Sequence, residues 1–500
     1  MNKKNLIFNF VGQGWTAIMG IVFIPFYIKY LGIELYGLVG FFAILQAWFL
    51  LIDMGMRPTL SREMAFYSGG SHTDKSIRDL LRSIEIIAIF FAFLITSIIA
   101  LSANWISSSW LQAGTVQLET ITRSLLIMSL VIGIRLIEGI YTSSLLGMQK
   151  HFVFNVVQSL MATIRGFGAV IVLKWVSPTI EAFFIWQAII SFVTLIIFIL
   201  VTYYFLPNIN RFARFSLNAL KSVSNFMAGM TLATILKVIL TQIDKILLSS
   251  LLLLSDFGYY NLAATVAAVT GVLIAPITQT VYPQFCEFKA NNKTDEFNSL
   301  YHQSSQLVTV VTGSIALVVI FFPENLLRLW TQDAELALIV SPLLALLMMG
   351  NLLNSFMWLP YQAQLAYGWT SLNIKINAVA IILLIPLLLY ITPIYGAYGA
   401  AFVWILLNCF YILAGVHLMH KKILKDEKWK WYFNDIFLPT IITTIALVLL
   451  KILYGYFNFN ENFEDFLVLA LAIILSFITM LLMASSLRPL IFQLIKNKTL

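Results

Sequence analysis

Long apolar runs alternate with short polar segments along the whole chain. Each run spans about twenty residues, which at about 1.5 Å per residue is enough for a helix to cross a hydrocarbon core of about 30 Å. The pattern predicts an all-α membrane protein with about fourteen transmembrane helices. The runs fall at residues 6–30, 36–56, 83–103, 121–146, 155–175, 182–205, 223–252, 257–284, 304–323, 338–358, 373–392, 398–418, 435–454 and 467–485.

Composition supports lipid as the solvent of this chain. Of its 500 residues, 60% are hydrophobic and only 11% are charged. A soluble domain has about 25% charged residues, because its surface must be hydrated. The first apolar run follows Lys3 and Lys4, but it is too long for the hydrophobic region of a signal peptide and contains Gln13. We therefore expect it to form the first membrane helix.

Basic residues indicate the orientation of these helices. If the N-terminus is cytoplasmic, the cytoplasmic segments hold 21 of the 31 Lys and Arg residues, whereas the outer loops hold only Lys174 and Arg328. Cytoplasmic loops of membrane proteins carry such an excess of positive charge, so we expect both termini in the cytoplasm. Tryptophans favour the two membrane–water interfaces. They fall at the expected outer interface (Trp105, Trp110, Trp175) and the expected inner one (Trp429, Trp431).

The sequence argues against several classes of function. The formal charge of +8 lies mostly in short loops between apolar runs, so it does not indicate nucleic-acid binding. The two cysteines, Cys286 and Cys409, have no metal-ligand spacing and cannot form a disulfide framework. No loop exceeds about twenty-five residues, and no phosphate-binding G-x-x-x-x-G-K-[ST] motif occurs. We therefore expect no catalytic site, no metal site and no bound cofactor.

An internal repeat indicates how the helices are grouped. Glu34–Leu38 leads into the second run and Ser255–Tyr259 into the eighth, at an offset of about 220 residues. With six runs in each half, both halves enter the membrane in the same direction, as in transporters built from parallel repeats. We therefore expect two parallel six-helix lobes around a central cavity, followed by two extra C-terminal helices. The predicted ranges are 1–216 for the N-lobe, 217–430 for the C-lobe and 431–500 for the remainder, including a cytoplasmic tail.

Six ionisable residues fall inside apolar runs, where a charge costs about 2.5–3.5 kcal/mol at the bilayer centre. Such residues persist when they face a water-filled cavity or a partner of opposite charge. Their formal charges sum to +2, which suits an anion of charge near −2. The basic members predict a cationic substrate-binding cavity, and the acidic members are candidates for ion coupling. They are Arg135, Arg165, Lys237 and Lys245, and Glu138 and Asp244.

A purely structural role stays open for most of these charges. Arg135 and Glu138 are three residues apart, so they could neutralise each other on one helix face. Lys237 and Asp244 share a helix face and could pair with each other. Lys245 could extend its ammonium group to the outer interface.

Arg165, Arg57 and Arg62 also bear on the prediction of a cationic cavity. Arg165 has no carboxylate within one helical turn, so it needs a partner elsewhere or a wet cavity. At the cytoplasmic end of the second run, Asp53 and Arg57 have the spacing of an ion pair on one helix. Arg57 and Arg62 could also attract the phosphate of a lipid head group at the cytoplasmic mouth.

Short motifs recur in the first, second, seventh and eighth runs. They are Asn9–Gly12, Pro25, Tyr27, Leu31–Gly32, Tyr36–Gly37, Asp53–Gly55, Arg62–Ala65, Gln242–Lys245, Phe257–Tyr260 and Ala263. These motifs resemble those of Wzx-type O-unit flippases, which form the polysaccharide-transporter branch of the multidrug/oligosaccharidyl-lipid/polysaccharide exporter superfamily. By topology, the similarity covers the whole chain. One departure is the turn Leu251–Ser255, which lacks the glycine expected there.

The resemblance implies a transporter of the bacterial inner membrane, with two lobes that open to one side at a time. Its implied cargo is an undecaprenyl-pyrophosphate-linked oligosaccharide, such as an O-antigen unit for lipopolysaccharide, moved from the cytoplasmic to the outer leaflet. Membrane lipid and other polysaccharide assembly proteins are the implied partners. Proton or sodium antiport through Asp244 or Glu138 is the candidate energy source. Two alternatives stay open: a cation-coupled multidrug exporter of the same superfamily and a membrane polysaccharide polymerase.

Overall fold

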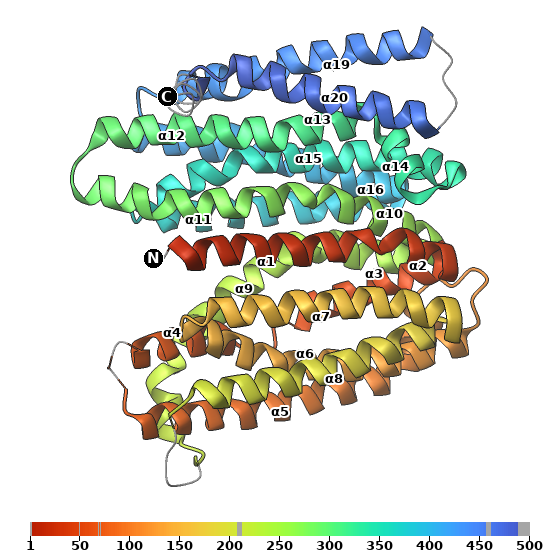
Figure 1. The fold of residues 1–500 in the computed structure, drawn as a ribbon, viewed down its shortest axis with the longest axis vertical. Coiled ribbons are helices and arrows are strands. Elements are labelled where there is room, and N and C mark those ends of the chain that lie inside the picture. Colours follow the sequence, from red (N-terminus) through yellow and green to blue (C-terminus); the bar gives the residue numbers. More distant parts are fainter. Residues whose placement is uncertain are drawn as a thin grey trace, which may run out of the picture. The chain divides into compact units, whose positions relative to one another are not determined.

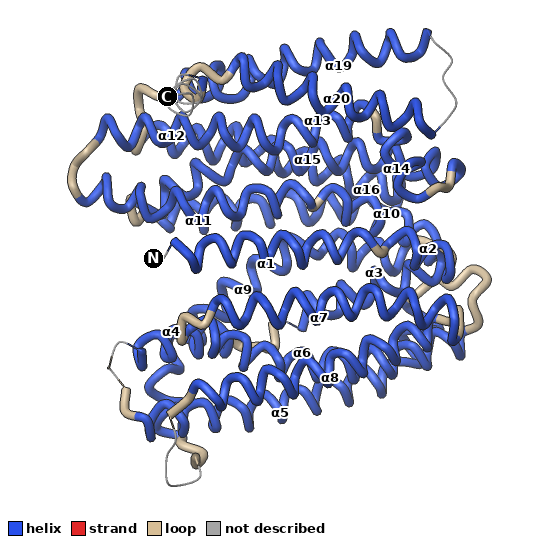
Figure 2. Tube along the Cα trace, in the orientation of Figure 1, coloured by secondary structure: helices blue, strands red, loops and turns tan. Residues whose placement is uncertain are grey.

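All regular secondary structure in the described part of the chain is helical. The computed structural model describes residues 3–49, 51–68, 70, 72–207, 213–456 and 462–488. Short loops join the helices (Figure 2). By packing, the chain divides into two compact units, Met1–Gly258 and Tyr259–Leu500, which are called unit 1 and unit 2 below.

Unit 1 holds the first nine α-helices, and α10 begins in it (Figure 1). The helix α6 packs between α5 and α8, while α1 packs along α7 and α4 packs on the C-terminal half of α6. Short π-helical segments, η1 and η2, extend α5 and α7. The bounds are α1 Lys3–Val22, α2 Ile24–Leu31, α3 Ile33–Phe49, α4 Met56–Ser68, α5 Asp74–Trp105, η1 Ile106–Trp110, α6 Leu118–Gly147, α7 His151–Ile171, η2 Val172–Val176, α8 Ile180–Phe205, α9 Leu217–Leu251 and α10 Leu254–Ala267.

Unit 2 is built around α15, which packs against α11, α13, α14 and α16. The two C-terminal helices α19 and α20 lie side by side (Figure 1). The bounds are α11 Val269–Ala290, α12 Thr294–Val308, η3 Thr309–Gly313, α13 Ser314–Phe321, α14 Pro323–Thr331, α15 Ala334–Ala366, α16 Thr370–Phe410, η4 Tyr411–Val416, α17 His417–Lys422, α18 Lys428–Lys430, η5 Trp431–Phe437, α19 Leu438–Tyr456 and α20 Asn462–Met483.

The number of spans agrees with the apolar pattern. Eleven helices in the described residues are long and apolar enough to cross a membrane. One of them, Ser371–Lys422, consists of two helices joined at Gly396, whose φ of 56° and ψ of −135° are not helical. Counting these two separately and adding the shorter apolar α3 and the 35-residue α9 gives fourteen. The all-α, multi-span fold is therefore confirmed.

The end of the second span differs from the expectation. The helix α3 stops at Phe49, and a turn over residues 51–55 leads into the separate helix α4. Met54 and Gly55 have positive φ values of 47° and 70°, and a Cβ on Gly55 would collide with the Met227 carbonyl oxygen of α9. Asp53 therefore lies in a sharp turn instead of on a continuous helix.

The two copies of the repeat motif meet each other within unit 1. A Cβ on Gly37 would overlap the Leu254 carbonyl oxygen, and a Cβ on Gly258 would overlap the Ile33 carbonyl oxygen. Each glycine thus faces the backbone four residues before the other glycine. Only residues without a side chain allow two helices to approach this closely.

The turn between α9 and α10 forms without the glycine that the family resemblance suggested. Leu252 is extended, with φ −98° and ψ 153°, so no left-handed residue is required. The backbone N–H of Leu254 donates a hydrogen bond of 2.8 Å to the backbone carbonyl of Gln112. The side-chain amide of Gln112 donates one of 2.9 Å to the backbone carbonyl of Ser250. Pairing with the loop after η1 fixes the turn.

A buried carboxylate joins α14 to α20 in unit 2. Arg328 donates two hydrogen bonds of 2.6 Å to Asp465, one to each carboxylate oxygen. Asn325 and Tyr454 donate to the same carboxylate, at 2.6 and 3.0 Å. This cluster ties the last span to the rest of unit 2.

The exposure of the tryptophans agrees with an interface position for three of them and not for Trp431. Trp105, Trp175 and Trp429 are 56%, 69% and 63% exposed, as expected for side chains in contact with lipid or head groups. The prediction for Trp431 was wrong, because its side chain is fully buried in unit 2, with its ring 5.5 Å from that of His420. Neighbouring residues of a helix point in different directions, so Trp429 and Trp431 cannot both face the membrane.

The packing units do not begin and end where the repeat predicts. The boundary at residues 258 and 259 places α9, the seventh span, with the first six spans. The helix α9 packs against α3, α4 and α5. The six-plus-six division at 216 and 217 therefore stays a prediction about the repeat.

The glycine contact gives a first prediction. Gly258→Ala should lower the unfolding temperature of the purified protein, because the added methyl group meets a backbone carbonyl that cannot move aside. Gly229→Ala, on α9, is the control, because no atom lies within 4 Å of its added Cβ. An exposed Gly→Ala change in a helix stabilises by roughly 0.5–1 kcal/mol, so the two variants should shift in opposite directions. Equal shifts would contradict the close approach.

Candidate functional site

A polar cavity of about 380 Å³ lies inside unit 1, among membrane-spanning helices. Residues of α3, α4, α6 and α7 line it. The apolar part of the lining comes from side chains such as Phe49, Ile132 and Phe154. The polar part consists of Gln46, Arg57, Arg135, Glu138, Thr142, Gln158 and Arg165.

Arg135, near the middle of α6, is held by neutral acceptors. Its Nη1 donates to the Gln46 side chain on α3 at 2.5 Å. Its Nη2 donates to the Gln187 side chain at 3.1 Å, and its Nε donates to the Ser191 hydroxyl at 3.2 Å, both on α8. Its guanidinium also lies 5.3 Å from the centre of the Phe42 ring. These contacts fix the side chain but leave its positive charge uncompensated.

Arg57 reaches the same cavity from α4. The expected pairing with Asp53 is present, with Nε 3.4 Å from Oδ1, although it joins the turn to α4. Its Nη2 donates to the Arg135 carbonyl at 3.2 Å. Gly139 makes this approach possible, because a Cβ there would occupy the position of the Arg57 guanidinium.

Glu138 and Arg165 are buried in this cavity with polar atoms that lack partners. Among the described residues, Glu138 Oε2 and Arg165 Nε have no hydrogen-bond partner. The three guanidinium groups that act electrostatically on Glu138 are those of Arg165, Arg135 and Arg57. Over the same described residues, no ion pair within 4.0 Å joins Glu138 to Arg135, so the mutual neutralisation left open by their spacing does not form.

The cavity is cationic. With all groups charged, Arg57, Arg135 and Arg165 outweigh Asp53 and Glu138 by one positive charge. Unpartnered buried polar atoms cost free energy, so they indicate a place where water or a polar ligand can bind. The geometry therefore fits an anionic group that carries hydrogen-bond acceptors.

Trp186 and Gly168 position the backbone of Arg165. The Trp186 indole donates to the Arg165 carbonyl at 3.1 Å. Gly168 gives the indole room, because a Cβ there would overlap its six-membered ring. These contacts fix the backbone of α7 where Arg165 projects.

Other residues predicted for the site lie outside this cavity. Arg62 is paired with Glu63 at 2.9 Å and lies between the rings of Phe66 and Phe226, each 4.6 Å away. Asp244 and Lys245 are partly exposed residues near the C-terminal end of α9. The side chain of Lys237 lies outside the described residues.

The sequence interpretation missed the neutral side chains that hold Arg135. Gln46, Gln187 and Ser191 carry no charge, so the search for ionisable residues did not select them. A signal was present nonetheless, because glutamine is rare inside apolar runs and must be hydrogen-bonded there. If Gln46 and Gln187 had been interpreted as buried amides, their oxygens would have predicted a hydrogen-bond donor, such as Arg135, between the two helices.

Comparison with known proteins places the chain in a family. Residues 3–289, more than half of the chain, match the family described as polysaccharide biosynthesis protein. A relative from Shigella flexneri, named "Putative O-antigen transporter", is 21% identical over 406 residues, which cover 80% of this chain and 93% of the relative.

Solved structures share the fold. Lipid II flippase MurJ in an inward closed conformation matches with a TM-score of 0.69 and 15% identity, covering 97% of this chain and 99% of that one. An inward-facing multidrug resistance MATE family transporter of the MOP superfamily matches with a TM-score of 0.63 and 11% identity, covering 84% and 95%. A MOP superfamily transporter from Pyrococcus furiosus matches with a TM-score of 0.57 and 12% identity, covering 84% and 96%.

These matches confirm the resemblance first seen in the motifs. At such identities the solved structures establish the fold, while the family match extends through most of the first eight spans. The chain therefore belongs to the polysaccharide biosynthesis protein family and is a multi-span membrane protein with the fold shared by MurJ and the MATE transporters.

Proposed function

We propose that this protein flips an undecaprenyl-pyrophosphate-linked oligosaccharide, an O-antigen or related repeat unit, from the cytoplasmic to the outer leaflet of the inner membrane. Transport proceeds by alternating access of two lobes to the two sides. The observation that carries the proposal is the cationic cavity of unit 1, in which Arg57, Arg135 and Arg165 converge between spans.

The charge pattern supports a phosphate-containing cargo. A guanidinium group matches phosphate oxygens with paired N–H donors and stays charged in an apolar setting. Arg57 and Arg165 have donors that are not taken up by carboxylates, whereas Arg135 is anchored and acts through its charge. A pyrophosphate entering the cavity would meet donors on α4 and α7 and a fixed positive charge on α6.

The same arrangement explains why the charges are tolerated. Moving a doubly negative group across a hydrocarbon core is prohibitive without compensation, and moving cationic side chains into that core is costly as well. When the pyrophosphate is in the cavity, its negative charge and the positive charge of the arginines compensate each other, so both costs fall. The polyprenyl tail stays in lipid, and the sugars pass through the wet space beside Gln46 and Gln158.

Ion coupling through Glu138 is part of the proposal. Its carboxylate lies among three guanidinium groups and has an oxygen without a partner in the described residues. Cargo pyrophosphate and the Glu138 carboxylate would compete for the same donors. Binding of a proton or sodium ion at Glu138 would therefore favour cargo binding, so coupling through this residue would move the ion and the cargo in the same direction, as in symport, and not in the antiport that the sequence suggested.

Removing either central arginine should abolish most transport. Arg165→Ala deletes hydrogen bonds to a charged group, worth about 1.5–3 kcal/mol, so cargo binding should weaken roughly 10- to 100-fold. Arg135→Ala removes the fixed positive charge beside the cargo, so it should weaken cargo binding as well. The measurement is surface polysaccharide in a flippase-null strain that expresses each variant, with membrane protein quantified in parallel.

A matched control for this experiment lies on the same helix. Arg123 is near the outer end of α6, 64% exposed and paired with Glu119, so Arg123→Ala should leave surface polysaccharide unchanged. Arg135→Lys should restore part of the activity, because it keeps the charge but not the hydrogen bonds to Gln187 and Ser191. Normal polysaccharide levels in both alanine variants would refute the role of the cavity.

The multidrug alternative predicts a different outcome. A cavity with excess positive charge repels cationic drugs, so expression in a drug-sensitive strain should not raise resistance to cationic dyes or antiseptics. The measurement is the minimum inhibitory concentration with and without the protein. A rise of fourfold or more, about 0.8 kcal/mol, that disappears in Glu138→Gln would favour the exporter.

A further inference from the structure

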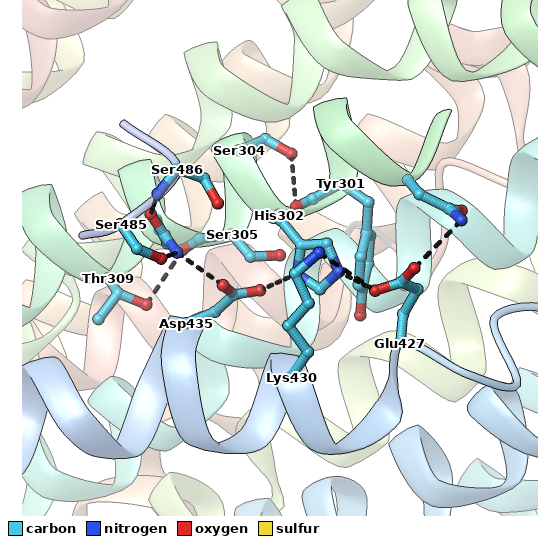
Figure 3. A network of polar contacts seen from close by, with 12 residues as sticks. Tyr301, His302, Ser304, Ser305, Thr309, Glu427, Lys430, Asp435, Ser485 and Ser486 are labelled. Atoms are coloured by element: carbon cyan, nitrogen blue, oxygen red, sulfur yellow. Dashed lines mark hydrogen bonds and ion pairs between the residues drawn. The ribbon is translucent and has the colours of Figure 1, made fainter. Parts of the chain in front are cut away.

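A buried imidazole in unit 2 contacts two carboxylates at once. Figure 3 shows His302, on α12, between Asp435 of η5 and Glu427, which precedes α18. Its Nδ1 lies 2.5 Å from Asp435 Oδ2, and its Nε2 lies 2.8 Å from Glu427 Oε2. The side chains of His302 and Asp435 are 2% and 0% exposed.

These two short distances fix the number of protons in the cluster. A neutral imidazole has one N–H donor, and its other nitrogen carries a lone pair. Two carboxylates are acceptors only, so a neutral ring could hydrogen-bond one of them and would repel the other. Both contacts can be hydrogen bonds only if the cluster holds one additional proton.

The chemistry of the neighbours places that proton on the ring. A carboxyl group is about two pK units more acidic than an imidazolium, so the ring is the better base. The Gln306 amide donates to Asp435 at 2.8 Å, which further stabilises the ionised carboxylate. Burial raises the pKa of Glu427, but the hydrogen bond and charge of His302 and the charge of Lys430 outweigh it and lower that pKa below its usual range. The formal charge of His302, Lys430, Asp435 and Glu427 is then zero.

The cluster connects three segments that are far apart in the chain. Glu427 and Asp435 bring the start of the thirteenth span to α12. Gln306, one turn after His302, accepts from the amides of Ser486 and Leu487 at 2.8 and 3.3 Å, just after α20. Asn298, one turn before His302, donates to Glu427 at 3.3 Å. The helix α12, the segment 427–437 and the chain just after α20 therefore meet at this one group of side chains.

Other ionisable groups surround the cluster, but Tyr301 and His420 pair with each other and do not donate a proton to its two carboxylates. The Tyr301 hydroxyl lies 3.2 Å from Nε2 of His420, so these two groups pair with each other. The helices α11 and α15 contribute aromatic packing instead of charges, through Phe285 and the helix end at Tyr367. The ionisable groups that face the cluster from the packed elements are Tyr301 of α12, His420 of α17, Lys428 and Lys430 of α18 and Tyr432 of η5.

The cluster is not arranged as a metal site. Direct contacts of 2.5 and 2.8 Å between the ring nitrogens and the carboxylate oxygens leave no position for a metal ion between them. Nor do the described residues include any group of three or more His, Cys, Asp or Glu side chains arranged to hold a metal. The ligand that fits is a proton.

We propose that His302, Asp435 and Glu427 form a proton-binding site that holds the segment 427–437 against α12 while the proton is bound. Loss of the proton leaves the buried carboxylate of Asp435 and the partly exposed carboxylate of Glu427 sharing one N–H donor, with an excess negative charge. Charge repulsion and the lost hydrogen bond then favour separation of the segment 427–437 from α12. This inference concerns the chain's own protonation and does not depend on the cargo proposed above.

The protonation state can be observed directly. The chain has only five histidines, so selective ¹⁵N-histidine labelling of the full-length protein in lipid bilayers gives few signals by solid-state NMR. At pH 7.5 one buried ring should carry protons on both nitrogens. That signal should be absent in His302→Gln, and it should change to a neutral ring in Asp435→Asn. A His302 ring that is neutral at every pH at which the protein is folded would overturn the proposal.

The coupling to structure needs a second measurement. Hydrogen–deuterium exchange of residues 427–437, corrected for the intrinsic rate, should rise at least tenfold as the pH increases from about 6 to about 9, the range in which a histidine site can lose its proton. In His302→Gln, exchange should be high and independent of pH. Exchange that does not depend on pH in the unmodified protein would overturn the locking role, even if His302 is doubly protonated.

Two further variants keep these tests decisive. His72, in unit 1, contacts the single carboxylate of Glu63 at 2.7 Å, so His72→Gln should leave exchange at 427–437 unchanged. If His302→Gln does not accumulate in the membrane, Glu427→Gln takes its place, because it removes one carboxylate at a partly exposed position. It should shift the His302 signal while the other four histidine signals stay in place.

Discussion

A guanidinium group inside a membrane domain needs hydrogen-bond acceptors, and in unit 1 Arg135 finds them without an ion pair. Arg135 donates to Gln46, Gln187 and Ser191, all of which are neutral. A carboxylate in their place would have satisfied the same donors and cancelled the charge. Because the acceptors are amides and a hydroxyl, the charge of Arg135 is not cancelled, and the cavity beside it stays positive. The same hydrogen bonds join α6 to α3 and α8.

Backbone geometry brings the second arginine to the same place. The left-handed conformations at Met54 and Gly55 end the second span early and start α4 in a new direction. Arg57 then reaches over Gly139, where no side chain blocks it, to the Arg135 carbonyl. Two positions thus determine the site through their backbone, one by turning the chain and one by leaving space. The glycine pair Gly37 and Gly258 plays the same part at the repeat motifs.

Parts of this arrangement could be predicted from the sequence because they break a local rule. Arg135, Arg165 and Glu138 are visible as charges in apolar runs, and the spans are visible through their length. The buried position of Trp431 and the cluster at His302 could not be predicted in this way. His302 lies in α12 just before the apolar run that begins at residue 304, where a polar residue breaks no rule, and its partners are 125 and 133 residues away in the chain. Contacts at that separation are decided by how the helices pack, and no periodicity along a single helix records them.

Buried charges are compensated differently in the two units, and the difference determines whether a ligand or only a proton can bind to them. In unit 1, charges face a cavity and keep atoms without partners in the described residues, so a ligand can complete them. In unit 2, His302, Asp435 and Glu427 complete one another. A cluster whose donors and acceptors are already matched has nothing to offer a second ligand, and its energy changes only when a proton enters or leaves. Polar groups without partners favour the binding of a ligand, whereas a fully paired cluster favours a change of state when its proton leaves, and the transport proposed for this chain would use both.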